Sequence, residues 1–187
     1  MSLITPGAAS IDILEERLPK VVYLSRIYDS MRIGIIPHVE YVTEENITQL
    51  AGFDFVFLCV DKGAVRKLVS AFLQQQGIPF IDVGMELIMI PDENSLLGTC
   101  RATLSTPEKS DHFDRHAPQG DGDGNDLYLS NIQVADMNAL NAALAVIKWK
   151  QYCGFYNDAV KAHHTTYSIN SHSLTRDEMV GELCGVQ

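Results

Sequence analysis

A carboxylate follows directly on the most apolar stretch of the chain. Seven of the eight residues from Phe53 to Val60 are apolar, and Asp61 comes next. A short, dense apolar run is typical of a strand that is covered on both faces. Groups at the carboxyl ends of such strands face the ligand crevice of α/β sheets. Asp61 can therefore hold a metal ion beside a phosphate chain or accept a hydrogen bond from a ligand, and it can equally cap a following helix.

A lysine also stands at an unusual position. The apolar stripe from Ile11 to Met31 has a helical period, and Pro19 divides it, so a second helix is expected to begin near Pro19. Lys20 then lies in the first turn of that helix, where a cation is unfavourable unless an anion lies nearby. The two interpretations are a lysine that contacts an anionic ligand and an ordinary solvated lysine.

The thiols give a weaker signal. The four cysteines, at positions 59, 100, 153 and 184, include no CxxC pair. Their scatter argues against a zinc site or a disulfide framework and is typical of a reducing compartment. Cys100 lies on an expected strand, and its surroundings favour a buried core thiol over a reactive one.

No spacing in the chain predicts a metal cluster. Asp121, Asp123 and Asn125 are spaced as in a calcium loop, but the glycine and the bidentate glutamate that such a loop needs are missing. His112 and His116 are interpreted as solvated side chains rather than as ligands. His163, His164 and His172 are interpreted as surface or interface residues, because the adjacent pair lacks the i, i+4 spacing of metal ligands on a helix.

The elements that carry these residues alternate between strand and helix. Strands are expected at 35–42, 53–61 and 78–84, followed by a hairpin of 85–90 with 96–104 and a last strand near 167–170. Helices are expected at 44–50, 64–76 and 131–152. This order predicts an α/β fold with a Rossmann-like, mainly parallel sheet that antiparallel strands extend. Residues 1–10 are expected to be a flexible leader, residues 11–187 a single α/β domain, and residues 105–127 a mobile loop within it.

Composition narrows the class of protein. The chain has 187 residues, of which 46% are hydrophobic and 20% charged, and this suits one domain with a sizeable core. Its net charge of −10 disfavours nonspecific attraction to nucleic acid or anionic membranes. No apolar run approaches the ~18 residues of a membrane span, and no secretory signal layout is present. We therefore expect a cytoplasmic protein without nucleic-acid or membrane partners.

The order of these motifs resembles that of one family. Its pieces are Pro19-Lys20-Val21 before a helix, Pro37-His38-Val39 entering a strand, Cys59-Val60-Asp61 ending a strand, Ala64-Val65-Arg66 opening a helix, and Ile78-Pro79-Phe80 leading to Gly84. The combination covers roughly Lys20 to Leu104. It resembles the ThiF/MoeB/HesA superfamily, the ubiquitin-activating-enzyme-like adenylyltransferases.

The resemblance carries expectations for chemistry. It implies ATP and magnesium as cofactors and, as partner, a ubiquitin-like or sulfur-carrier protein whose C-terminal carboxylate is adenylated. It implies that Lys20 contacts the nucleotide phosphates, that Asp61 organises magnesium, and that Arg66 is structural. Cys100 is the nearest candidate for the thioester-forming cysteine of the family.

The departures from the family pattern concern the nucleotide site. The family's glycine-rich loop and acidic ribose-binding residue should lie about fifty residues before Lys20, but the nineteen residues that precede it contain one glycine, Gly7. The chain is therefore expected to be the C-terminal part of a longer adenylyltransferase, or a degenerate relative, and by itself inactive and poor at binding ATP. The alternative function is a non-catalytic, homodimeric scaffold with the same fold. A dehydrogenase half is disfavoured because no GxGxxG is present.

Overall fold

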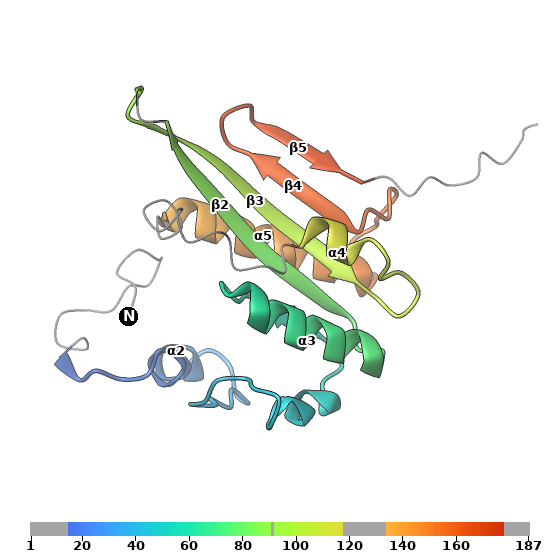
Figure 1. Cartoon of the computed structure of the whole chain (residues 1–187). Helices are drawn as coiled ribbons and strands as arrows, with labels where there is room; N and C mark the ends of the chain where they lie inside the picture. The colour runs from blue at the N-terminus through green and yellow to red at the C-terminus, as the bar shows by residue number, and fades with distance from the viewer. Residues whose placement is uncertain (1–14, 91, 118–133, 178–187) are drawn as a thin grey trace, which may run out of the picture.

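A five-stranded sheet with helices on both faces makes up the computed structural model, which describes residues 15–90, 92–117 and 134–177 (Figure 1). In chain order and in sheet order alike the strands are β1 (Val56–Leu58), β2 (Phe80–Ile90), β3 (Ser95–Ser105), β4 (His164–Ser168) and β5 (Ser173–Arg176). The helices are α2 (Lys20–Asp29), the 3-10 helix η1 (Ile47–Gly52), α3 (Gly63–Gln76), α4 (Phe113–His116) and α5 (Ala135–Tyr152). None of the helices in the described ranges combines the length and hydropathy that a bilayer crossing requires.

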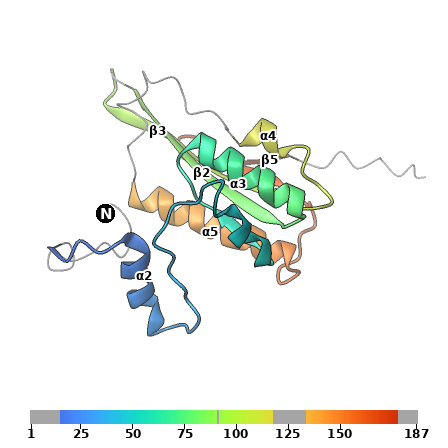
Figure 2. The same ribbon diagram turned by 60° about the horizontal axis from the view of Figure 1, so that its bottom comes forward.

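Alternating residues of β2 supply the cores on the two faces of the sheet. Phe80 is fully buried on the side of α3 and α4, where its ring meets that of Phe113 at 5.0 Å between centroids. The next residue, Ile81, is buried on the opposite side with Ala145 of α5. Figure 2 shows α3 and α5 on the two sides of the strands. Because side chains alternate along a strand, the apolar run of β2 serves both layers.

The β1–α3–β2 unit is the part of the fold that the sequence predicted most closely. α3 covers the expected 64–76 helix, and Gly77 ends it with a φ of 67°. The amide of Ile78 then bonds to the carbonyl of Leu73 at 2.9 Å, which closes the last turn. The helix brings the chain back so that β2 pairs parallel with β1.

The remaining pairs in the described sheet are antiparallel, so the expectation of a mainly parallel sheet is wrong in its proportions. The predicted hairpin is confirmed and is long: β2 and β3 pair from Phe80–Ser105 to Ile90–Ser95. β4, near the expected last strand, pairs with β3 and then turns back into β5. Only one crossover helix, α3, joins parallel neighbours within the described residues.

Two other expectations need correction. Residues 35–42, expected as a strand, pair with no strand in the described part of the chain, and Ile36 is 77% exposed. Residues 105–117, expected in a mobile loop, instead pack on the sheet: Phe113 is fully buried and His112 nearly so. The helix expected at 44–50 is the short η1. The leader (1–10), residues 118–127 of the loop and the calcium-like spacing lie outside the described residues.

Gly84 gives a test of how tightly the sheet is packed. A Cβ at this position would meet the guanidinium of Arg101, approaching its Cζ to 2.8 Å. Because that guanidinium is held by Asp82, we expect Gly84→Ala to lower the free energy of unfolding by about 1–3 kcal/mol, the usual cost of overpacking. Gly52→Ala is the control, since nothing lies within 4 Å of its Cβ. Urea unfolding followed by circular dichroism measures both, and equal stability of the two variants would contradict the packing argument.

Candidate functional site

The carboxyl end of β1 carries the acidic residue that the sequence singled out. β1 ends at Leu58, and Asp61 lies exposed in the turn before α3. The N-cap of α3 is Lys62, and no side chain caps the helix. Asp61 therefore does not cap the helix, and its exposed carboxylate can accept hydrogen bonds from a ligand or bind a cation.

Lys20 lies at the position expected from the sequence. It is the first residue of α2, its N-cap is Pro19, and the first turn contains no acidic residue. The ammonium is exposed. Because the amino end of a helix carries partial positive charge, a lysine here favours an external anion.

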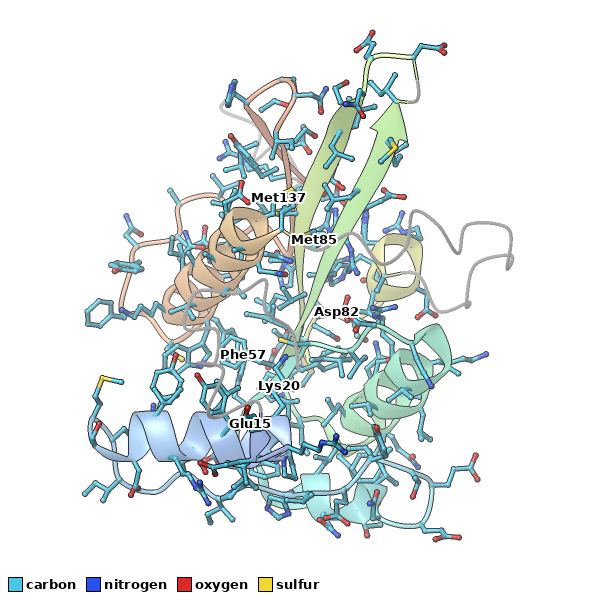
Figure 3. The ribbon with its side chains drawn as sticks, turned by 90° about the vertical axis from the view of Figure 1, so that its left-hand side faces the viewer. Glu15, Lys20, Phe57, Asp82, Met85 and Met137 are labelled. Atoms are coloured by element: carbon cyan, nitrogen blue, oxygen red, sulfur yellow. The ribbon has the colours of Figure 1, made fainter. Side chains whose placement is uncertain are left out.

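Lys20 and Asp61 lie close enough to the same thiol to change its pKa. The pKa of Cys59 is raised by desolvation first, then by the carboxylates of Asp82 and Asp61, while Lys20 lowers it. In Figure 3, Lys20 lies near Phe57 of β1 and below Asp82. The structure thus brings together a cation and a carboxylate that are 41 positions apart in the sequence, at the strand end that in such sheets faces ligands.

A buried ion triad lies behind this turn. Asp82 of β2 is fully buried, and its two carboxylate oxygens accept from Arg66 Nε of α3 at 2.9 Å and from Arg101 of β3 at 2.5 Å. Arg66 also donates to the carbonyl of Val60 at 2.6 Å. A buried carboxylate with two guanidinium partners is charge-compensated, whereas removal of one partner from a buried pair is strongly destabilising.

The triad continues across the sheet as a row of polar residues. Asp82, Thr103 and His164 are register partners on β2, β3 and β4, so they lie side by side on the face that carries α3. Thr103 Oγ1 lies 3.3 Å from Arg101 and 3.0 Å from His164 Nδ1. Thr166 Oγ1 lies 3.0 Å from the other nitrogen of the His164 ring. The hydroxyls thereby satisfy both ring nitrogens of a buried histidine.

Four histidines gather at the end of this row. The rings of His116 and His164 stack at 4.0 Å between centroids, and those of His112 and His163 meet edge to face at 5.3 Å. His116 also pairs with Asp177. The expectation that His112 is solvated is wrong, because it is buried, and His164, expected at the surface or in an interface, is buried within this chain. Within the described residues no group of His, Cys, Asp or Glu has a geometry that could hold a metal ion.

Burial keeps three of these rings neutral. Desolvation is the first cause of the lowered pKa of His112, of His163 and of His164, whose pKa falls to about 4. Coupling to His116, Arg101 and His112 lowers the pKa of His164 further, whereas the carboxylate of Asp177 raises it. His112 is consistent with a neutral ring: Nε2 donates to the carbonyl of Leu104 at 2.8 Å, and Nδ1 is buried without a hydrogen-bond partner among the described residues, 4.0 Å from the carboxylate of Asp111.

Cys100 lies in the core. It is fully buried on the side of α5, and its thiol lies 3.5 Å from the carbonyl of Met137. Burial, with a smaller contribution from Asp136, raises its pKa to about 11. Such a thiol is protonated at neutral pH and inaccessible, so the interpretation as a core residue describes it better than that of a thioester-forming cysteine.

Sequence reasoning did not single out Asp82 or the contacts between histidines. Asp82 did leave a signal, because it is the one charged residue in the otherwise apolar run from Ile78 to Gly84. A charge in a strand covered on both faces needs a partner. The histidine contacts leave no such local signal, since β4 joins β3 only in the folded sheet.

The histidine cluster predicts acid sensitivity. Each ring with a lowered pKa binds a proton more readily in the unfolded chain, so stability is unaffected above the ordinary pKa of 6.5 and falls as the pH falls toward about 4. We expect a loss on the order of 2 kcal/mol in the free energy of unfolding over this range. His164→Asn should make the slope shallower, and His38→Asn, at a side chain that is 58% exposed, should not. Denaturant unfolding between pH 4 and 7.5 measures the slopes, and identical slopes in both variants would contradict the assignment.

The comparisons with known proteins bear on the fold. No family model and no curated protein sequence matches the chain. Among solved structures it is similar to E. coli MccB crystallised with MccA, with a TM-score of 0.57, 15% identity and coverage of 97% of this chain and 56% of that one. It is also similar to PaaA, with a TM-score of 0.51, 11% identity and coverage of 92% of this chain and 55% of that one. The chain thus spans just over half the length of these neighbours, and the likeness is one of fold.

Proposed function

We propose that the chain is part of an ATP-dependent adenylyltransferase that activates the C-terminal carboxylate of a ubiquitin-like or sulfur-carrier protein. One observation carries the proposal: Lys20, the first residue of α2, lies near β1 (Figure 3), and Asp61 follows the carboxyl end of that strand. The sequence resemblance gives a phosphate-binding role to the first and a magnesium-binding role to the second. The E1-like fold of the structural neighbours supports this reading.

The two residues fit the chemistry of a nucleotide triphosphate. Lys20 offers an exposed ammonium at a helix start that has no acidic residue of its own. Asp61 offers one exposed carboxylate. Magnesium is commonly held by one or two carboxylates together with substrate phosphates and water, so a full protein cage is not required. Magnesium supplies positive charge at the phosphates when it is bound.

The reaction is the attack of a carboxylate on a phosphoanhydride. A carboxylate oxygen of the partner's C-terminus forms a bond to the α-phosphorus of ATP, and the bond from that phosphorus to the bridging oxygen breaks, which releases pyrophosphate. Lys20 neutralises charge that develops on the phosphate oxygens. Asp61 would hold the magnesium ion that binds the same phosphates. The nineteen residues before Lys20 contain one glycine, Gly7, and so lack the family's glycine-rich loop of backbone donors; the chain alone should therefore bind MgATP poorly.

A scaffold is the second candidate function, and one observation favours it. Apolar side chains are exposed along the segment after α2, with Ile33 at 92% and Tyr41 at 91%, and further along β1 at Phe57. Such a surface is typical of a protein–protein interface. α5 packs Met137 and Ala145 against the sheet and also leaves apolar side chains exposed, Val146 and Ile147.

The reactivity of Cys59 tests whether Lys20 and Asp61 really share one site. In a Cys153→Ser/Cys184→Ser background, Lys20→Met should raise the pKa of Cys59 further and slow its alkylation at pH 8 by about threefold. Asp61→Asn should lower that pKa and speed alkylation by a similar factor. Lys62→Met is the matched control, because Lys62 is exposed yet not among the charges that shift Cys59. Rates of iodoacetamide labelling over pH 7–10 give the values, and no response to either charge would remove the shared site.

Pyrophosphate exchange tests the activity itself. In the full-length protein, supplied with ATP and its carrier protein, Lys20→Ala and Asp61→Ala should each lower the exchange rate by about 100-fold or more, as loss of a charge-stabilising group does. Lys62→Ala should change it little. Exchange that survives in both variants would remove the roles of Lys20 and Asp61, and a wild-type protein without exchange would favour the scaffold.

A further inference from the structure

We propose that Arg66, held in place by Asp82, is a positioning residue for the turn that carries Asp61. The consequence for catalysis rests on the proposed function, but the positioning itself does not. The hydrogen-bonded ladder between β1 and β2 ends just before this turn. β1 and β2 pair only over three residues, and the last pair joins Leu58 to Asp82. Beyond Leu58 the chain runs through Cys59, Val60 and Asp61 without a strand neighbour on β2.

Arg66 replaces the missing ladder bonds. Its terminal nitrogen donates to the carbonyl of Val60 at 2.6 Å, and its Nε donates to Asp82 at 2.9 Å. The guanidinium therefore bridges the residue just before Asp61 and the carboxylate that faces the end of β1. Both the Arg66 and the Asp82 side chains are buried, at 8% and 0% exposure. A rigid, planar fork can make both bonds at once, whereas the single ammonium of a lysine cannot reproduce the geometry.

Arg101 provides the contrast within the same triad. It donates to the other oxygen of Asp82 at 2.5 Å and lies near Thr103, on the far side from the turn. In the described part of the chain it makes no hydrogen bond or ion pair with a residue between Cys59 and Lys62. Loss of Arg101 should therefore disturb the triad without releasing the turn. A purely structural triad predicts the same local effect from both arginines, and a positioning role predicts different ones.

The experiment compares Arg66→Met with Arg101→Met, with hydrogen–deuterium exchange of the backbone amides from Cys59 to Lys62 as readout. The bond from Arg66 to the carbonyl of Val60 restrains this turn, and amides exchange faster where the backbone opens more easily. Arg66→Met should therefore speed exchange in the turn by about threefold to tenfold, as expected for the loss of one hydrogen bond. Arg101→Met should leave exchange in the turn close to the wild-type rate, because the bonds of Arg101 run to Asp82 and Thr103. If Arg66→Met does not fold, Arg66→Lys replaces it with the same expectation.

Each outcome decides the proposal. Unchanged amide exchange in the turn of the folded Arg66 variant would overturn it, and so would equal acceleration by both arginine substitutions. In the full-length protein, Arg66→Lys should lower kcat of pyrophosphate exchange more than it changes KM for ATP, whereas Arg101→Lys should change neither beyond its effect on stability. A wild-type protein without pyrophosphate exchange would defeat the proposed function and leave the amide-exchange result to decide whether Arg66 positions the turn.

Discussion

The buried charge of Asp82 is the constraint on which the arrangement of this sheet depends. A carboxylate with no solvent contact is costly unless it is paired and hydrogen-bonded. Here the partners come from a helix and from the neighbouring strand, Arg66 and Arg101. One side chain thereby fixes the helix α3, the register of β2 with β3 and the requirement for a glycine at position 84, where Arg101 occupies the space of a side chain.

Local patterns predicted the elements better than their pairing. The period and the glycine cap of α3, the turn of the β2–β3 hairpin and the apolar face of α5 are all encoded within short windows. Strand direction is not, because a buried strand shows the same apolar run in parallel and antiparallel neighbours. The segment 35–42 has the alternation of a strand, but whether it joins a sheet depends on a neighbour that a local pattern cannot reveal.

In the candidate site, too, local sequence patterns predicted single residues but not the contacts between distant segments. Lys20 stood out because a cation is unfavourable at the start of a helix. Asp61 stood out because it follows an apolar strand, at the end that faces ligands in such sheets. Their shared effect on Cys59 and the gathering of four histidines depend on contacts between segments far apart in sequence. Thr103 and His164, for example, are 61 positions apart and become neighbours only through the pairing of β3 with β4.

The shortness of β1 has a consequence for the order in which the molecule assembles. The β2–β3 hairpin pairs eleven residues with eleven across one tight turn, so its contacts are local in sequence and form early. β1 adds three pairs and must wait for the α3 crossover to close. We therefore expect β1, the edge strand that precedes Asp61, to dock on the sheet after the hairpin has formed. We also expect it to detach by local unfolding while the hairpin stays intact. Anything that binds there also stabilises that edge of the sheet, because ligand binding and the docking of β1 share one equilibrium.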